Sequence, residues 1–251
     1  MNYNPAVMSA ENIDHARIDQ LESDAVALLQ QIEEQFSPAT LANSFGAEDM
    51  VLMDLVCRHA IGVGIFVLDT GRLPAETYNL MDESRKKYGA TIDVYYPQTL
   101  TLQEFVRENG VNAFYNSLEM RKGCCGIRKV EPLGRALKER KAWVTGLRRE
   151  QSPTREDLGN REWDEGHNME KFNPLIEWTE RDVWGYIHKH GVPYNKLHDQ
   201  HFPSIGCAPC TRSVTIGEDI RAGRWWWENP DSKECGLHVA GAAPASRIGQ
   251  G

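Results

Sequence analysis

Hydrophobic and polar positions along the chain follow two repeating patterns. Between residues 15 and 35, apolar side chains such as Ile18, Leu21 and Leu29 recur near the spacing of an amphipathic helix. The run 61–68 is instead continuously apolar apart from two glycines, which is typical of a strand buried on both faces. The whole pattern predicts helices over 15–35, 48–58, 74–88, 102–108, 127–140 and 179–189, and strands over 40–43, 61–68, 91–96 and 142–145.

The order of these elements predicts the fold class. Strands and helices alternate, which favours an α/β fold with a mostly parallel sheet flanked by helices. Ligands of such sheets bind at the carboxyl ends of strands, so the candidate site lies in the loops after Ser44, Leu68 and Thr145.

The pattern also suggests how the chain is divided. It is lost after residue 191, where we expect a loop-rich segment that ends in a mobile, Ala- and Gly-rich C-terminal tail. The prediction is an N-terminal helical segment (1–38), an α/β domain (39–212) and a C-terminal segment (213–251).

The composition narrows the class of protein. Hydrophobic residues make up 41% and charged residues 25% of the 251 positions, ordinary values for a folded globular protein. No apolar run is long enough to span a membrane, and residues 1–24 lack a secretory signal, so we expect a cytoplasmic protein with no membrane partner. The net charge of −8 argues against nucleic acid as a partner, although local arginine clusters allow a small anionic substrate.

Cysteine spacing points to a metal site. In a reducing cytosol, paired cysteines indicate metal ligation or redox chemistry rather than disulfides. Cys124 and Cys125 are adjacent, and Cys207 and Cys210 form a second pair far along the chain, as in a four-thiolate site. We favour an iron–sulfur cluster over zinc, because adjacent side chains can each take a separate iron. Buried free thiols, or a thioredoxin-type pair at Cys207 and Cys210, are the alternatives, while Cys57 is expected to pack in the core.

Two motifs follow strand ends. The segment 44–49, Ser-Phe-Gly-Ala-Glu-Asp, can hold an anion on backbone N–H groups at a helix start, or it is an ordinary turn. It lacks the Gly-x-x-x-x-Gly-Lys pattern of a P-loop NTPase. The segment 145–155 carries Arg148, Arg149 and Arg155, whose guanidinium groups suit phosphate and sulfate oxygens; a solvated basic loop is the alternative.

Cys235 stands apart from the paired cysteines. It lies beside Gly236 near the end of the chain, which suits a mobile nucleophile better than core packing. His238 can support a thiolate there, or it is simply solvated.

These motifs together resemble the sulfonucleotide reductase family, specifically the bacterial assimilatory adenylyl-sulfate reductases. The resemblance extends from about residue 40 to His238. The segments that carry it are 44–49, 68–71, 122–129, 145–155, 206–212 and 234–238. It implies a fold like that of the adenine-nucleotide α-hydrolases, in which the segment 44–49 is a modified PP-loop.

The resemblance also implies roles for individual residues. Cys235 would be the catalytic nucleophile. A 4Fe-4S cluster would be held by Cys124, Cys125, Cys207 and Cys210. Lys129 would link this cluster to the substrate electrostatically. The phosphosulfate would be bound by Arg148, Arg149, Arg221 and Arg224. The full set of implied substrate contacts is Ser44, Phe45, Gly46, Asp49, Leu68, Thr70, Lys129, Gly146, Arg148, Arg149, Arg221, Arg224 and His238.

The implied activity is thioredoxin-dependent reduction of adenosine 5′-phosphosulfate to sulfite and AMP through a cysteine S-sulfonate, in sulfate assimilation and cysteine biosynthesis. Thioredoxin or glutaredoxin would be the electron donor, because no thioredoxin-like domain follows Cys235. Reduction of 3′-phosphoadenylyl sulfate is the nearest alternative. An ATP-using PP-loop enzyme and a zinc-stabilised binding module are further alternatives, and the sequence leaves homo-oligomer formation open.

Overall fold

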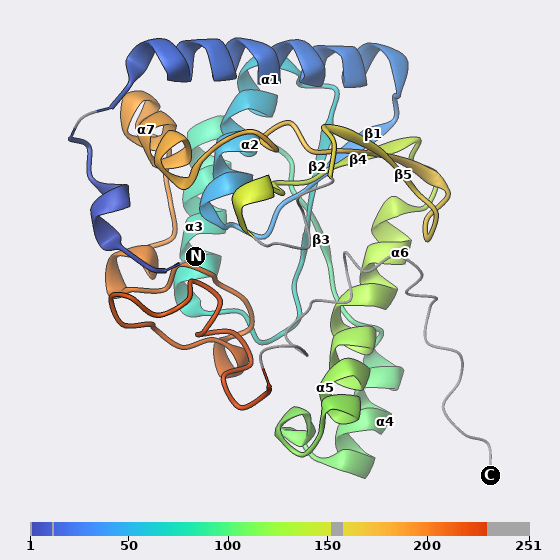
Figure 1. Ribbon diagram of the computed structural model, residues 1–251. Coiled ribbons are helices and arrows are strands. Elements are labelled where there is room, and N and C mark those ends of the chain that lie inside the picture. The colour runs from blue at the N-terminus through green and yellow to red at the C-terminus, as the bar shows by residue number, and fades with distance from the viewer. Residues whose placement is uncertain (1, 12, 152–157, 230–251) are drawn as a thin grey trace.

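A six-stranded sheet forms the centre of the computed structural model, which describes residues 2–11, 13–151 and 158–229 (Figure 1). The strands are β1 (Ala39–Ala42), β2 (Gly64–Leu68), β3 (Asp93–Tyr95), β4 (Ala142–Val144), β5 (Arg161–Asp164) and β6 (Met169–Phe172). Their order in the sheet is β3-β2-β1-β4-β6-β5, and neighbours are parallel except for the antiparallel pair of β5 and β6. The predicted mostly parallel α/β fold is confirmed.

Two groups of helices cover this sheet. Figure 1 shows α1, α2, α3 and α7 together, with α4, α5 and α6 in a second group. The helices are α1 (His15–Gln35), α2 (Ala47–His59), α3 (Ala75–Tyr88), α4 (Thr99–Asn109), α5 (Leu118–Cys125), α6 (Glu131–Leu137) and α7 (Glu180–His190). Short 3-10 turns are η1 (Pro5–Met8), η2 (Ala113–Tyr115), η4 (Arg149–Gln151), η6 (His198–Gln200) and η7 (Ala208–Cys210), and η3 (Gly126–Val130) is a π-helix.

The alternation of side chains along β2 divides the core into two parts. Ile65 and Val67 belong to the larger cluster, which includes apolar residues of α1, α2 and α7. Phe66, between them, belongs to a smaller cluster with Leu133 and Leu137 of α6. Successive side chains of a strand point to opposite faces, so one short strand contributes to both clusters.

Local sequence signals explain how α7 begins. The Thr179 hydroxyl accepts a hydrogen bond from the Asp182 N–H, and the Asp182 carboxylate accepts one from the Thr179 N–H at 2.8 Å. This capping box satisfies backbone donors that the first turn leaves unpaired. The Asp182 carboxylate also pairs with Arg17 of α1 at 2.9 Å, which ties the two helices together.

Some sequence predictions were wrong in detail. The buried strand starts at Gly64 rather than Ile61, because residues 61–63 form a turn in which Ile61 is 83% exposed. Pro74 is the N-cap of α3 and not its first helical residue. The β5–β6 hairpin and α5 were not predicted, because charged residues interrupt the apolar pattern of both segments. The proposed boundaries after residues 38 and 212 stay predictions.

The described residues contain no helix whose length and apolar character would let it cross a membrane.

Truncation of Leu29 tests how strongly α1 belongs to the core. Its side chain is fully buried, so Leu29→Ala should lower the free energy of unfolding by about 2–5 kcal/mol through lost burial and the cavity left behind. Gln30→Ala, on the exposed face of the same helix, is the matched control and should change it by less than about 0.5 kcal/mol. Equal effects in urea unfolding would contradict this packing.

Candidate functional site

The site is built where three parallel strands end. β1 lies between β2 and β4, so the loops that follow them leave the same edge of the sheet. Backbone pairing continues past the strands: the Asn43 N–H donates to the Phe66 carbonyl at 2.9 Å, and the Thr145 N–H donates to the Phe172 carbonyl at 2.9 Å. These loops, together with residues from α7 and the C-terminal segment, line a cavity of about 300 Å³. That volume is at the lower end of the range for small-molecule sites.

The loop between β1 and α2 donates hydrogen bonds to the carboxylate of Asp49, in the first turn of α2. The Ser44 N–H and hydroxyl donate to the Asp49 carboxylate at 2.7 and 2.6 Å. Phe45 has a positive φ of 62° and its side chain is fully buried beneath the loop. Gly146 faces Asp49 so closely that a Cβ there would collide with the Asp49 carboxylate. Burial raises the pKa of Asp49 to about 6.

A second internal ion pair lies beside this loop. The Arg148 side chain is 3% exposed and donates to Glu48 at 2.8 Å and to Glu150 at 3.0 Å. The Gln151 amide donates to the same Glu48 oxygen at 2.9 Å. Burial would raise the pKa of Glu48, but the charge of Arg148 and these hydrogen bonds hold it below its usual value. Burial also raises the pKa of nearby Glu180, to about 7.

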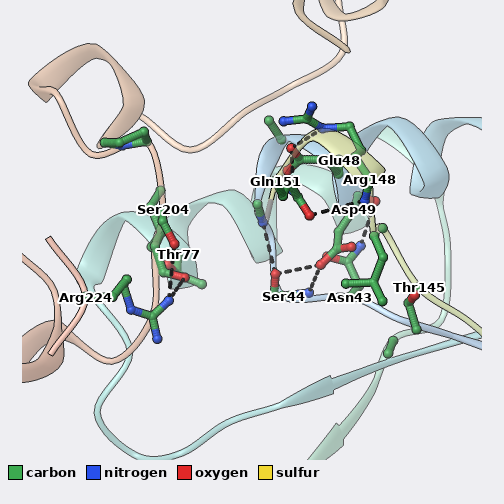
Figure 2. A pocket seen from close by; sticks show the side chains of 18 of the residues that line it. Asn43, Ser44, Glu48, Asp49, Thr77, Thr145, Arg148, Gln151, Ser204 and Arg224 are labelled. Carbon is green, nitrogen blue, oxygen red and sulfur yellow. Dashed lines mark hydrogen bonds and ion pairs between the residues drawn. The ribbon is translucent and has the colours of Figure 1, made fainter. Parts of the chain in front are cut away.

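The opposite end of the cavity is cationic. The Arg224 guanidinium donates to the Ile205 carbonyl at 3.2 Å and lies 4.7 Å from the centre of the Trp225 ring. Arg221 is one turn earlier and also lines the cavity, as does Lys129. Figure 2 shows Arg224 and Ser204 well separated from Glu48, Asp49 and Arg148 on the other side. The cavity therefore has an acidic end and a cationic end.

Four cysteines lie next to the cationic end. Side chains from α5 and from the segment around η7 line a small second cavity, and they include Cys124, Cys125, Cys207 and Cys210. Burial and the neighbouring thiols raise the pKa of Cys210 to about 12, whereas Arg224 and Lys129 act in the opposite direction. The Thr70 hydroxyl lies 3.2 Å from the sulfur of Cys207.

The π-helix after Cys125 places two cations at this cavity. Such single-turn insertions are frequent at functional sites. Here η3 carries Arg128 and Lys129, and both side chains line the cysteine cavity. Lys129 also lines the larger cavity, so one side chain borders both. In the described part of the chain, no group of three or more His, Cys, Asp or Glu residues meets the geometry needed to hold a metal ion.

Most of the predicted substrate residues come together. Ser44, Gly46, Asp49, Leu68, Thr70, Lys129, Gly146, Arg148, Arg221 and Arg224 line the larger cavity. Phe45 lies beneath the loop, and Arg149 is outside the lining and donates to Glu177 at 2.5 Å. Cys235 and His238 lie outside the described residues.

Sequence reasoning missed part of the lining. Thr77, Glu180 and His198 come from segments without a recognisable motif, and Glu48 and Gln151 were considered only as members of the segments 44–49 and 145–155. Glu180 is in the first turn of α7, where an acidic residue is expected for helix stability alone. Only the tertiary packing brings these side chains to the cavity.

A family model matches most of this structure. Residues 38–213 match the phosphoadenosine phosphosulfate reductase domain. This chain belongs to that family.

Relatives within the phosphoadenosine phosphosulfate reductase family include bacterial proteins of similar length. The adenosine 5′-phosphosulfate reductase of Allochromatium vinosum is 52% identical over 89% of this chain and 87% of the relative. That of Burkholderia cepacia is 51% identical over 91% of this chain and 90% of the relative.

Solved structures show the same architecture. The phosphoadenylyl-sulfate reductase of Candida auris, in a phosphate complex, has a TM-score of 0.66 at 26% identity, covering 81% of this chain and 98% of that one. An FMN adenylyltransferase from Candida glabrata has a TM-score of 0.57 at 15% identity, covering 91% and 82%, a likeness of fold alone. The PP-loop-like fold expected from the sequence is thereby confirmed.

The raised pKa of Glu180 predicts a pH effect on stability. The folded protein holds a proton there that the unfolded chain loses near the usual value of 4.5, so stability falls as the pH rises from about 4.5 to 7. Glu180→Gln removes this loss. Its free energy of unfolding, relative to that of wild type, should therefore rise by about 1–2 kcal/mol between about pH 5 and 8. Glu177→Gln, at a site 66% exposed, is the control, and parallel urea-unfolding curves for Glu180→Gln and wild type across this range would refute the assignment.

Proposed function

We propose that this protein reduces adenosine 5′-phosphosulfate to sulfite and AMP, with a dithiol protein such as thioredoxin or glutaredoxin as reductant. Relatives that share about half of its residues over nearly their whole length bear the name adenosine 5′-phosphosulfate reductase. This reaction belongs to sulfate assimilation and cysteine biosynthesis. The thiol chemistry requires a reducing compartment, which favours the cytoplasm.

The observation that carries the proposal is the cationic end of the cavity. Lys129 lines the same cavity as Arg221 and Arg224, although it lies far from these two arginines in the chain. Guanidinium and ammonium groups match the oxygens of a phosphosulfate, and their charge offsets the repulsion between this anion and an attacking thiolate. The part of the cavity at the carboxyl ends of the strands, beside these cations, would hold the adenosine, as in other open α/β sheets.

The residues around the cysteines fit an iron–sulfur cluster. Four thiols line one cavity. Four cysteine thiolates are the usual ligands of a 4Fe-4S cluster, and each would bind a different iron. Arg128 is 7% exposed, and its buried Nε has no hydrogen-bond partner among the described residues. An anionic cluster would supply the missing acceptor and would offset the cost of burying this charge.

When bound through Cys124, Cys125, Cys207 and Cys210, the cluster would supply a fixed charge beside the substrate. The Lys129 ammonium would interact electrostatically with both the cluster and the substrate, because its side chain borders both cavities. The role of Lys129 is to hold the phosphosulfate at the cationic end.

The first chemical step is a displacement at sulfur. The Cys235 thiolate attacks the sulfate sulfur, a bond forms between the two sulfurs, and the bond from that sulfur to the bridging oxygen breaks. AMP leaves with the bridging oxygen and its electron pair. The cysteine is left as an S-sulfonate, and Lys129, Arg221 and Arg224 stabilise the charge on the departing phosphate.

The second step releases sulfite. A thiolate of the reductant attacks the sulfur of Cys235, the bond to the sulfonate breaks, and sulfite leaves with the electron pair. The resulting mixed disulfide is resolved by the second thiol of the reductant. The reductant ends as a disulfide and Cys235 as a thiol, so two electrons have passed from the reductant to the substrate's sulfur, which leaves as sulfite.

Cysteine substitutions test the nucleophile. Cys235→Ser should abolish sulfite release and S-sulfonate formation, because a serine hydroxyl cannot replace the thiolate at neutral pH. Mass spectrometry of wild type given substrate without reductant should show the sulfonate on the peptide that contains Cys235. Cys57→Ser is the matched control and should retain activity within about twofold, since Cys57 packs against the core and lines neither cavity. Turnover by Cys235→Ser would refute the mechanism.

Metal analysis tests the cluster. Anaerobically purified protein should be brown and contain about four iron and four sulfide per chain. Cys124→Ser or Cys210→Ser should lose this content, whereas Cys57→Ser should keep it. Zinc without acid-labile sulfide would instead support a zinc-stabilised binding module.

A further inference from the structure

A buried ion pair joins α5 to the C-terminal segment. The Nε and Nη2 of Arg121 donate to the two oxygens of the Glu228 carboxylate, each at 2.8 Å. Both side chains are almost fully buried, at 2% and 7% exposure. A two-pronged contact of this kind fixes the direction of the guanidinium as well as its distance. Because burial costs both charges their hydration, such a pair contributes little net stability, and its geometry is the property to explain.

Arg121 shares an aromatic ring with a cation of the larger cavity. The Trp225 ring is 2% exposed, and the guanidinium carbon of Arg121 lies 4.6 Å from its centre. The guanidinium carbon of Arg224 lies 4.7 Å from the same centre. Two guanidinium groups against one ring attract the ring but repel each other, and the charge of Glu228 offsets this repulsion at Arg121. The Trp225 ring therefore connects the buried ion pair to Arg224.

Other contacts hold Arg224 only weakly. Its Nη1 donates to the Ile205 carbonyl at 3.2 Å and to the Ser204 hydroxyl at 3.5 Å, at and beyond the long end of the usual range. Its buried Nε has no hydrogen-bond partner among the described residues. Gly206 packs so closely that a Cβ there would collide with the guanidinium. Packing against Gly206 and Trp225 therefore decides where Arg224 points.

The backbone of Trp225 is held in place by its surroundings. Its φ of 42° is in the left-handed region, which is rare for a bulky residue and costs conformational energy. The Trp225 N–H donates to the Cys210 carbonyl at 3.2 Å, and the Trp225 carbonyl accepts from the Glu228 N–H at 2.8 Å. Such strain persists only where neighbouring contacts maintain it. Glu228 supplies two of these contacts, one through its N–H and one through Arg121.

We propose that Glu228 is a positioning residue for the phosphosulfate. Its carboxylate holds Arg121 against Trp225, and the ring in turn holds Arg224 at the cationic end of the cavity. Arg121 and Glu228 are outside the lining of that cavity, so they act through the ring and not by contact with the substrate. This inference rests on the proposed function, in which Arg224 binds the phosphosulfate.

Nucleotide binding to the holoprotein tests the proposal. In a Cys235→Ser background, where no S-sulfonate forms, Glu228→Gln keeps the shape of the side chain and removes its charge. Calorimetric titration should show AMP binding weakened by about tenfold, because a misplaced Arg224 loses its charge-assisted hydrogen bonds to the phosphate. Adenosine lacks the phosphate, so its affinity should change by less than about twofold. A general distortion of the cavity would instead weaken both ligands alike.

A double variant tests whether the effect passes through Arg224. Arg224→Met alone should weaken AMP binding by about tenfold or more. Adding Glu228→Gln to Arg224→Met should then cost less than about a further twofold, since effects that share one route are not additive. Glu228→Asp keeps the charge with a shorter reach and should give a smaller loss of AMP affinity, so it serves the same test if Glu228→Gln folds poorly.

Two control variants separate positioning from net charge and from stability. Glu170→Gln removes the same charge from an ion pair with Arg161 on the β5–β6 hairpin, outside the cavity lining, and should leave AMP affinity unchanged. Leu29→Ala destabilises the fold from α1 and should also leave the AMP affinity of the folded protein unchanged. All variants are compared at equal iron content per chain.

The outcomes also distinguish this inference from the proposed function. If wild type binds AMP and releases sulfite, the proposed function stands. The inference is then overturned by an unchanged AMP affinity in Glu228→Gln, by equal losses for AMP and adenosine, or by full additivity with Arg224→Met. If wild type neither binds AMP nor releases sulfite, the proposed function itself fails, and the inference fails with it.

Discussion

Parallel pairing of β1 with β2 and β4 is the constraint on which the site depends. It brings the residues after three separate strands to one edge of the sheet, and backbone bonds from Asn43 and Thr145 extend the pairing into the loops. The two hydrophobic clusters hold the sheet from both sides, so the loop positions follow from core packing. The position of the cavity is therefore a property of the fold, and its chemistry is a property of the loops.

Charge is distributed unevenly over these loops. Lys129 and Arg224 lie near the cysteines, whereas Glu48 and Asp49 lie at the start of α2. In the proposed function, a substrate with one anionic end places that end at Lys129 and Arg224 and its sulfate within reach of the proposed Cys235 nucleophile.

The sequence was sufficient for the fold class, and most of the substrate contacts it predicted lie at the cavity, because both depend on local signals. Apolar periodicity predicts α1 and β2, and the paired cysteines lie together as their spacing suggested. The sequence did not predict the partner of Arg148, which the structure pairs with Glu48 across 100 positions of the chain. No local pattern encodes such a partner, and none predicts that His198, the first residue of η6, lines the cavity.

The most direct measurement is a crystal structure of the holoprotein with AMP bound. The account predicts that the phosphate of AMP contacts Lys129 and Arg224 at the cationic end of the cavity. A phosphate bound instead at the start of α2, with the Glu48–Arg148 pair broken, would contradict the orientation on which the proposed function depends.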